Sequence, residues 1–187
     1  MRIWLLRCLD SIFGIRVSLC FGLEQANARL TPLPPGFRGG FVEPRTLARY
    51  MGEAFDKAFL EQACAESMDA YAIFHQSNDG GRLATVNWLA RKAPVRSGDY
   101  LIHFEDSIVY GHRVDTHPDY RGRGLFPCAV HRAMQEYQAQ GFHLMLANVE
   151  AHNLSSIRGA YRGGHRRLGL ALIGHCMGQP YAIHTPG

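Results

Sequence analysis

Residues 114–126 constrain the fold of this chain more than any other segment, because an apolar strand pattern leads through a short turn directly into a helical pattern. The turn reads Arg121-Gly122-Arg123-Gly124. Its two glycines allow backbone N–H groups to approach a ligand closely, and the following helix directs its unpaired donors and the positive end of its dipole to the same place. We interpret the segment as a diphosphate-binding loop, with an ordinary strand-to-helix connection as the alternative.

The loop and the strand before it resemble the coenzyme A motif of the GNAT superfamily of acetyltransferases. The family has Arg or Gln, two residues, Gly, one residue, and then Gly or Ala; here Arg121, Gly124 and Phe126 hold these positions. Val114, Thr116 and Pro118 match the apolar-x-apolar-x-Pro strand end that precedes the motif in the family, with Thr116 in place of the usual Val. Phe126 departs from the pattern, since it is large where the family has a small residue.

A second segment that resembles the same family lies further along the chain. It reads Asn153, two residues, and then Ser156-Ile157-Arg158, and it closes with Gly164-His165 where the family usually has Gly-Phe. Together the two segments extend over roughly residues 100–177, while the N-terminal half matches the family only in the order of its elements.

The order of expected elements is that of an α+β fold with a mixed sheet. Apolar periodicity and turn signals predict strands at 15–21, 71–75, 83–90, 100–116, 142–149, 168–175 and 181–184, and helices within 43–68, at 124–140 and at 153–162. Residues 78–81 indicate a hairpin, residues 30–40 a loop, and breaks are expected near Gly52 and near 105–106.

The resemblance implies a single GNAT-like domain at 36–187, preceded at 1–35 by an amphipathic helix, a strand and a linker. In that fold the strands that end near Thr116 and Val149 run parallel at the centre of the sheet and splay apart, with helices on the flanks.

The resemblance also implies that acetyl-CoA or another acyl-CoA is the co-substrate. Its pantetheine arm is expected to enter between the splayed strands and to pair with the backbone of Val114, Asp115 and Thr116 like an additional strand. Asn153, with Ser156 nearby, is expected to bind near this arm, although Asn153 is equally suited to cap a helix. The residues expected around the diphosphate are Arg121, Gly122, Arg123, Gly124, Leu125 and Phe126.

The family reaction is attack of a neutral amine on the thioester carbonyl of acyl-CoA, and it needs a base because a free amine is protonated at neutral pH. Some members carry one or two histidines at the positions equivalent to 110 and 112, so His112 is the first candidate and Tyr110 is considered with it. Strand alternation places Tyr110, His112, Val114 and Thr116 on one face. The alternative for His112 is a hydrogen-bonded sheet histidine without a chemical role.

Other residues are candidates for proton transfer. Other members use a carboxylate earlier on this strand, here Glu105 or Asp106, for which a turn or a solvated strand end is the alternative. The family often uses a tyrosine to protonate the thiolate that leaves, and Tyr161 is the candidate. The family tyrosine more commonly lies at the position of Ala160, and one residue corresponds to about 100° around a helix, so the alternative is that Tyr161 faces the core.

Charge and spacing argue against two other classes of function. The formal net charge is +4, but the 20 Lys and Arg residues are scattered and form no aromatic-interleaved stripe, so we do not expect nucleic acid as a partner. The 10 histidines follow none of the compact spacings that place two ligands on one face, so we expect no metal.

Residues 2–13 have apolar side chains at helical spacing, which predicts an amphipathic helix. Arg7 and Asp10 interrupt the apolar run, which argues against a secretory signal and for a cytoplasmic protein. We expect this helix to pack on the domain or on a second subunit, with docking to a membrane surface or a partner as the alternative. A homodimer through the C-terminal strands is left open.

The leading hypothesis is an acyl-CoA-dependent N-acyltransferase, most simply an acetyltransferase, that acts on the primary amine of a small molecule or peptide. One alternative is a longer-chain acyltransferase of the same fold, and another is a non-catalytic domain that binds CoA or a nucleotide as a sensor. The acceptor is expected against residues 43–68 and 91–99, which carry no motif that identifies it.

Overall fold

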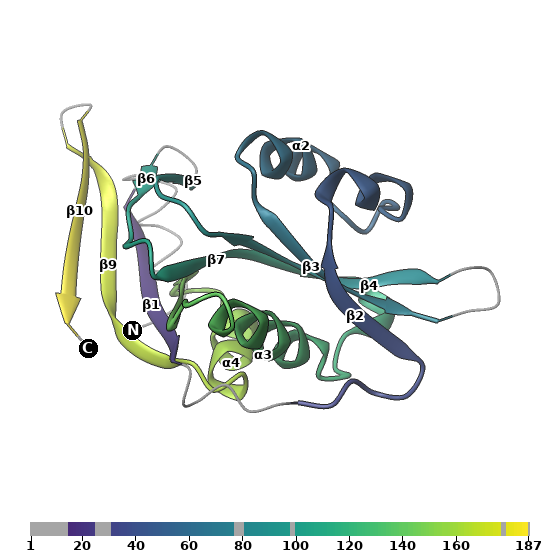
Figure 1. Ribbon diagram of the computed structural model, residues 1–187. Helices are drawn as coiled ribbons and strands as arrows, with labels where there is room; N and C mark the ends of the chain where they lie inside the picture. The colour runs from purple at the N-terminus through teal and green to yellow at the C-terminus, as the bar shows by residue number, and fades with distance from the viewer. Residues whose placement is uncertain (1–14, 25–30, 77–80, 98–99, 177–178, 187) are drawn as a thin grey trace.

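An eight-stranded sheet with helices on both faces forms the centre of the structure, a computed structural model that describes residues 15–24, 31–76, 81–97, 100–176 and 179–186 (Figure 1). The sheet has the order β10-β9-β1-β8-β7-β4-β3-β2, and β5 and β6 form a separate two-stranded sheet. The strands are β1 (Arg16–Glu24), β2 (Phe37–Val42), β3 (Asp69–His75), β4 (Arg82–Ala90), β5 (Val95–Ser97), β6 (Tyr100–Ile102), β7 (Ile108–Thr116), β8 (Leu144–Glu150), β9 (Arg166–Cys176) and β10 (Gln179–Pro186). The helices are α2 (Lys57–Ala65), α3 (Leu125–Gln138) and α4 (Leu154–Arg162), with short 3-10 helices η2 (Pro44–Arg49) and η3 (Pro118–Tyr120).

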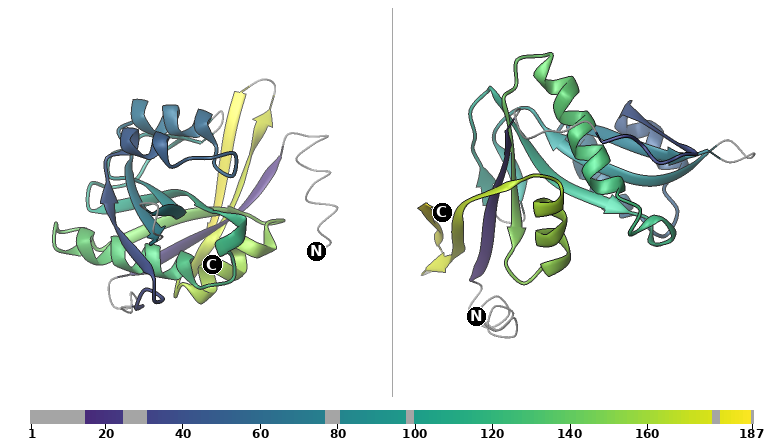
Figure 2. Two further views of the ribbon diagram at one scale, coloured as in Figure 1. Left: turned by 90° about the vertical axis from the view of Figure 1, so that its right-hand side faces the viewer. Right: turned by 90° about the horizontal axis from the view of Figure 1, so that it is seen from below.

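The sheet separates two apolar cores, because side chains alternate between its faces. α3 covers one face with a stripe of buried residues that includes Leu125 and Ala129. α2 and η2 cover the other face, where the ring of Phe59 lies 5.7 Å from that of Trp88 in β4. Every residue of β4 except Arg82 is buried, which explains its nearly continuous apolar sequence. Figure 2 shows α2 and α3 on opposite sides of the sheet.

β7 and β8 are parallel neighbours at the centre of the sheet, but they pair only over Ile108–Gly111 and Leu144–Ala147. Beyond these residues β7 remains paired with β4 as far as Thr116, and β8 remains paired with β1 as far as Glu150. The two strands therefore diverge while their outer neighbours hold them. This confirms the predicted α+β class and the splayed parallel pair.

β1 lies between β8 and β9 and is antiparallel to both. Its residues Phe21 and Leu23 are fully buried, so this first strand of the described chain fills the interior of the sheet. The amphipathic helix predicted at 2–13 lies outside the described residues. In the part of the chain that the structure describes, no helix is long and apolar enough to cross a membrane.

Three expectations about local structure are corrected. Residues 37–42, predicted within and beside a loop, form the edge strand β2, which pairs with β3. The paired glycines lie within this strand, and a Cβ at Gly39 would lie 3.0 Å from Ile73 Cγ1. The first part of 43–68 is the 3-10 helix η2, although the predicted break near Gly52 is present. The predicted interruption near 105–106 is also present, but β6 before it pairs with β5 and not with the main sheet.

The position of β1 leads to a prediction about stability. Replacing Phe21 with Ala removes a fully buried ring from the centre of the sheet, so we expect a loss of about 3–5 kcal/mol in the free energy of unfolding. Leu101→Ala is the matched control, because Leu101 is 55% exposed, and its effect is expected to stay within about 0.5 kcal/mol. Urea denaturation of both variants checks this; equal effects would contradict a structural role for β1.

Candidate active site

A β-bulge interrupts β7 beside the point where it leaves β8. Trp88 of β4 pairs with Arg113, but the next residue, Leu89, pairs with Gly111, so His112 is the extra residue. The bulge puts two consecutive side chains on one side of the sheet: the ring of Phe59 lies 5.1 Å from the ring of His112 and 5.0 Å from the guanidinium carbon of Arg113.

The bulge corrects the predicted alternation along β7. Tyr110 and His112 do share the α2 side, where their rings meet edge to face at 6.0 Å. After the bulge, however, Arg113 and Asp115 take this side, so Val114 does not share a face with His112. Regular alternation fails here because one extra residue reverses the phase of all that follow.

His112 is hydrogen-bonded on one nitrogen and has the other nitrogen free. Its Nε2 lies 2.8 Å from the backbone carbonyl oxygen of Arg96, which can only accept, so Nε2 carries the hydrogen. In the neutral ring Nδ1 then holds the lone pair, and among the described residues it has no hydrogen-bond partner although it is buried. His112 is therefore tied to the carbonyl of Arg96 through Nε2, and its Nδ1 is left with an unpaired lone pair among the described residues.

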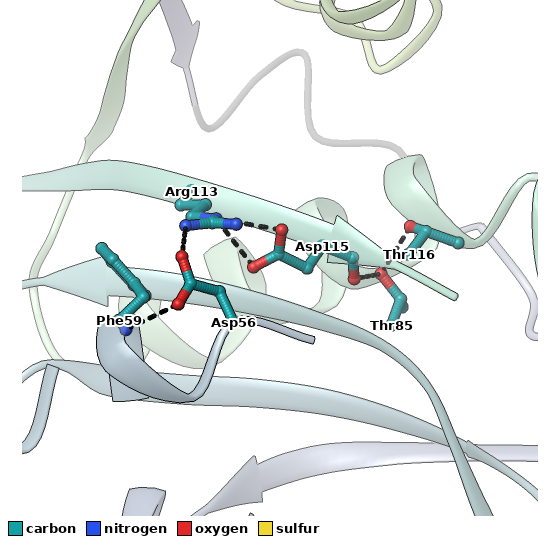
Figure 3. Close-up of polar contacts among 6 residues, drawn as sticks. All are labelled: Asp56, Phe59, Thr85, Arg113, Asp115 and Thr116. Carbon is teal, nitrogen blue, oxygen red and sulfur yellow. Dashed lines mark hydrogen bonds and ion pairs between the residues drawn. The ribbon is translucent and has the colours of Figure 1, made fainter. Parts of the chain in front are cut away.

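Arg113 of β7 forms ion pairs with Asp56 at the start of α2 and with Asp115 of its own strand (Figure 3). Its Nη1 donates to Asp56 and its Nε donates to Asp115, each at 2.9 Å. Asp56 is also the N-cap of α2, where it accepts from the backbone N–H of Phe59 at 3.1 Å. This N–H and the guanidinium lower the pKa of Asp56. Burial acts to lower the pKa of Arg113, but the two carboxylates outweigh it and the pKa is raised.

The end of β7 is held from two directions. Thr85 of β4 donates from Oγ1 to the backbone oxygen of Asp115 at 2.8 Å and also contacts the hydroxyl of Thr116 at 2.8 Å (Figure 3). Arg121 donates from Nε to the backbone oxygen of Thr116 at 3.2 Å. These contacts place the predicted pantetheine segment and the predicted diphosphate loop next to each other.

The Gly/Arg turn has the conformation that its glycines predict. Gly122 and Gly124 have φ of +76° and +73°, in the left-handed region that favours glycine. A Cβ built at either position would meet no other atom of the described chain within 4 Å. Gly124 is also the N-cap of α3, and it has no side chain to satisfy the first N–H groups of the helix. The first turn of α3 is therefore suited to bind an anion.

The two departures from the family motif contact each other. The ring of Phe126 stacks on that of His165 at 6.3 Å, with 25° between the planes. A Cβ at Gly159 or Gly163 of the α4 region would lie 3.6 Å or 3.3 Å from the same phenyl ring. The large residue therefore occupies space between α3 and α4 that small residues and the histidine leave for it.

The structure places the remaining predicted residues as follows. Asn153 caps α4, because its side-chain oxygen accepts from the backbone N–H of Ser156 at 3.1 Å. Tyr161 is 52% exposed and does not face the core, and its ring meets Phe21 of β1 edge to face at 5.3 Å. Glu105 is exposed in the turn before β7, where its backbone oxygen accepts from Ile108.

Tyr110 is buried on the α2 side, where its ring stacks on Phe104 at 5.9 Å. Burial raises the pKa of its hydroxyl, as does Cys20 nearby, while hydrogen bonds with Asn148 act in the opposite direction. The hydroxyl is consequently protonated at neutral pH and acts as a hydrogen-bond donor, not as a base.

Sequence reasoning did not identify Asp56, Phe59 or the carbonyl of Arg96 as parts of this site. They come from two separate segments, α2 with its N-cap and β5, and no spacing relates them to β7. A side-chain cluster able to hold a metal is not found in the described ranges.

The comparisons with known proteins agree with this geometry. No family model matches the chain. Two proteins named L-methionine sulfoximine/L-methionine sulfone acetyltransferase, from Pseudomonas paraeruginosa and Pseudomonas aeruginosa, are each 38% identical over 63 residues, which is 34% of this chain and 34% of the relative. The chain thus matches about a third of the length of these curated relatives.

Solved structures match over most of the chain. A GCN5-related N-acetyltransferase from Sphaerobacter thermophilus has a TM-score of 0.60 at 13% identity and covers 98% of this chain and 56% of its own. One from Kribbella flavida has a TM-score of 0.57 at 15% identity, covering 92% of this chain and 60% of its own. The fold is that of the GNAT acetyltransferases, as the motifs implied.

His165 supplies a prediction about acid stability. Burial lowers the pKa of His165 to about 4, although hydrogen bonds to the carbonyls of Ala160 and Gly163 act against it. An unfolded histidine titrates near 6.5, so between about pH 6.5 and 4 the unfolded chain binds the extra proton and stability falls as pH falls. His165→Phe removes this proton uptake on unfolding. As the pH falls from 7 to 5, the free energy of unfolding of the variant is therefore expected to rise by about 2 kcal/mol relative to that of the wild type.

Urea denaturation at the two pH values measures the effect. His143→Phe is the matched control, because His143 is exposed, and it is expected to leave the pH dependence unchanged. Parallel pH curves for wild type and His165→Phe would show that the buried histidine does not govern acid stability.

Proposed function

We propose that this protein is an acyl-CoA-dependent N-acyltransferase, most simply an acetyltransferase, that transfers the acyl group directly to a primary amine of a small molecule or peptide. The observation that carries the proposal is the divergence of β7 from β8 next to a left-handed glycine loop and the uncapped first turn of α3. An acyl-CoA suits such a combination, because its pantetheine amides can pair with a strand edge and its diphosphate can bind at an anion site.

The cofactor lies along backbone groups in this proposal. Beyond Gly111 one edge of β7 pairs with β4 and the other has no β8 partner in the described chain, so the amides of pantetheine pair with Val114, Asp115 and Thr116. The diphosphate lies on the N–H groups of Gly122 to Phe126 at the positive end of α3. Arg121 and Arg123 add charge, and Asn153 with Ser156 borders the pantetheine.

The chemistry requires the acceptor ammonium to lose two protons, one before the attack and one as the amide forms, and it requires one proton to reach the sulfur. Nδ1 of His112 takes a proton from the ammonium of the acceptor, and the neutral amine attacks the thioester carbonyl. The nitrogen of the tetrahedral intermediate loses its second proton to solvent, and the intermediate collapses as its C–S bond breaks, which releases the amide product and the CoA thiolate. Tyr161 is the donor that we propose for this thiolate, and its exposed position lets solvent return the proton.

The proposal assigns the acceptor to a depression at the end of β7. A depression of about 540 Å³ lies between residues 50–55, the start of β4 and the end of β7. It is lined by both aromatic and charged side chains, including Phe55, Glu53, Arg82 and His117, and it suits a small polar molecule. The name of the Pseudomonas relatives supports amino-acid-like amines as the first acceptors to test.

Calorimetric titration with CoA, acetyl-CoA and a long-chain acyl-CoA tests the proposal without knowledge of the acceptor. Binding of acetyl-CoA followed by turnover with amines supports it. Preference for the long chain would favour the longer-chain acyltransferase, binding without turnover would favour a sensor, and no binding to any of the three would reject all of them.

Gly124→Ala tests the diphosphate loop. A side chain at positive φ strains the backbone by about 1–2 kcal/mol and narrows the approach to the first N–H groups of α3, so we expect at least a tenfold loss of CoA affinity. Gly141→Ala is a matched control at the other end of α3: its φ is +94°, and a Cβ there also meets no atom of the described chain within 4 Å. The two variants should lose similar stability, but only Gly124→Ala should lose affinity, by calorimetry. Equal CoA affinities would remove the loop from the site.

His112→Gln tests the base. The glutamine amide donates to the Arg96 carbonyl in place of Nε2 but cannot accept a proton, so we expect kcat/KM to fall about 100-fold or more at neutral pH. The loss should shrink at high pH, where the amine deprotonates by itself. The pH profile of kcat/KM measures this, with the exposed His103→Gln as control. An activity within twofold of wild type would leave His112 with a structural role alone.

A further inference from the structure

We propose that the hydroxyl of Tyr110 donates a hydrogen bond to the carbonyl oxygen of the thioester and stabilises the negative charge that this oxygen carries once the amine has attacked. Asn148 is the positioning residue that holds the hydroxyl at the point where β7 and β8 separate. The inference rests on the proposed function, because it assigns a partner to the thioester of that reaction. The comparisons with known proteins give no role to either residue.

Tyr110 lies just before the point where the two parallel strands separate. It pairs with Leu146 of β8, and the last pair of the two strands, Gly111 with Ala147, follows directly. Asn148 is the next residue of β8, so it is the first one without a partner in β7. Tyr110 and Leu146 belong to the core on the α2 side, and alternation puts the side chain of Asn148 on the same side. Both the backbone and the side chain of Asn148 form hydrogen bonds with the Tyr110 hydroxyl, which therefore lies at the opening between the strands.

The hydrogen of the Tyr110 hydroxyl is available to a bound ligand. Burial raises the pKa of the hydroxyl, so the hydroxyl keeps its hydrogen at neutral pH. The hydrogen bonds with the backbone and the side chain of Asn148 both act to lower this pKa, which is the effect of donors to the phenol oxygen. Asn148 thus donates and Tyr110 accepts. None of the described residues accepts the hydroxyl hydrogen in turn.

His112 and Tyr110 act on the two reactants of the same step. Their rings meet edge to face at 6.0 Å on the α2 side, so the base and the hydroxyl are neighbours. Nδ1 of His112 accepts the proton of the amine, while the hydroxyl faces the carbonyl. As the C–N bond forms, the π electrons of the carbonyl move to its oxygen, and they return to the C=O bond when the C–S bond breaks. Tyr110 keeps its own proton throughout.

The surroundings of the hydroxyl strengthen this hydrogen bond. Tyr110 is buried, and its ring stacks on that of Phe104 at 5.9 Å, so water screens the interaction poorly. The two donors of Asn148 polarise the O–H bond and fix the oxygen before the substrate arrives. A donor that is already in place stabilises the developing charge without reorganisation during the reaction.

Tyr110→Phe keeps the ring and removes the donor. Because a single donor to such an oxyanion typically contributes two orders of magnitude or more, we expect kcat to fall about 100-fold or more. The affinity for CoA, which lacks the acyl carbonyl, should be unchanged. Tyr137→Phe is the matched control: Tyr137 is also buried, but its hydroxyl donates to Asp69 at 2.7 Å on the α3 side of the sheet. This control should leave kcat unchanged.

Infrared spectroscopy of bound acetyl-CoA, labelled with ¹³C at the acyl carbonyl, tests the contact without turnover. A hydrogen bond lowers the stretching frequency of a carbonyl, so the band should lie lower in the wild type and in Tyr137→Phe than in Tyr110→Phe. S-ethyl-CoA, a thioether without the carbonyl, is the second probe. Tyr110→Phe should bind acetyl-CoA roughly three- to tenfold more weakly than the wild type does, but S-ethyl-CoA with the same affinity.

Asn148→Leu tests the positioning role. It removes the side-chain donor but keeps the backbone N–H, so kcat should fall less than in Tyr110→Phe, and the infrared band should shift in the same direction. The double variant Tyr110→Phe/Asn148→Leu should have no lower kcat than Tyr110→Phe, because Asn148 acts through the hydroxyl. Additive losses would instead indicate that Asn148 has only a structural role.

The outcomes separate this inference from the proposed function. If the wild type does not bind acetyl-CoA, both fail. If it binds and the band is the same in the wild type and in Tyr110→Phe, only the inference is overturned, and a fall in kcat would then assign the hydroxyl to the departing sulfur. An equal loss of affinity for acetyl-CoA and S-ethyl-CoA would also overturn it, because packing would then explain the effect. A cooperative thermal melt of Tyr110→Phe shows that the assays report on a folded protein.

Discussion

The rest of the structure depends on the early end of pairing between β7 and β8. Two parallel strands at the centre of a sheet would normally continue to pair through their backbone hydrogen bonds. Here they separate because each remains paired with a different antiparallel neighbour, β7 with β4 and β8 with β1. The strand edge that results carries backbone donors and acceptors at the centre of the molecule. β1 therefore has a functional consequence although it contributes none of the residues assigned to binding, because it keeps β8 from closing onto β7.

The conformation of the loop proposed to bind the cofactor could be predicted from the sequence, because the loop is a local feature. Gly122 and Gly124, the strand before them and the helix after them occupy one short segment, and backbone conformation alone gives them their geometry. The parallel, splayed pair followed from the same resemblance. Asn153 was predicted both as a cap and as a pantetheine contact, and the structure establishes the cap.

The α2 side of the proposed site could not be predicted in the same way, because it is assembled from distant segments and from an irregularity. Strand alternation with a period of two gives no signal for an extra residue, so the bulge at His112 was not predicted. The bulge places the residues after it on the opposite faces from those expected. Asp56 meets Arg113 across 57 positions of sequence, and the carbonyl of Arg96 comes from β5, a short strand that was not predicted. The strand β2 was missed for a related reason: Gly39 and Gly40 indicate a turn in isolation, but close packing against the neighbouring strand favours glycine at position 39.

The two large departures from the family pattern are best understood as one change. Phe126 fills the space between α3 and α4, Gly159 and Gly163 provide room for its ring, and His165 stacks on it in place of the usual phenylalanine. A histidine at this position has a polar ring nitrogen in a buried site, and this nitrogen, Nδ1, forms a hydrogen bond with the backbone carbonyl of Ala160 at the end of α4. The ring of Phe126 thereby points into the layer between the helices, and its backbone N–H remains in the first turn of α3. A large side chain at this motif position is compatible with a diphosphate site, because the anion would be bound by main-chain donors that the phenyl ring leaves accessible.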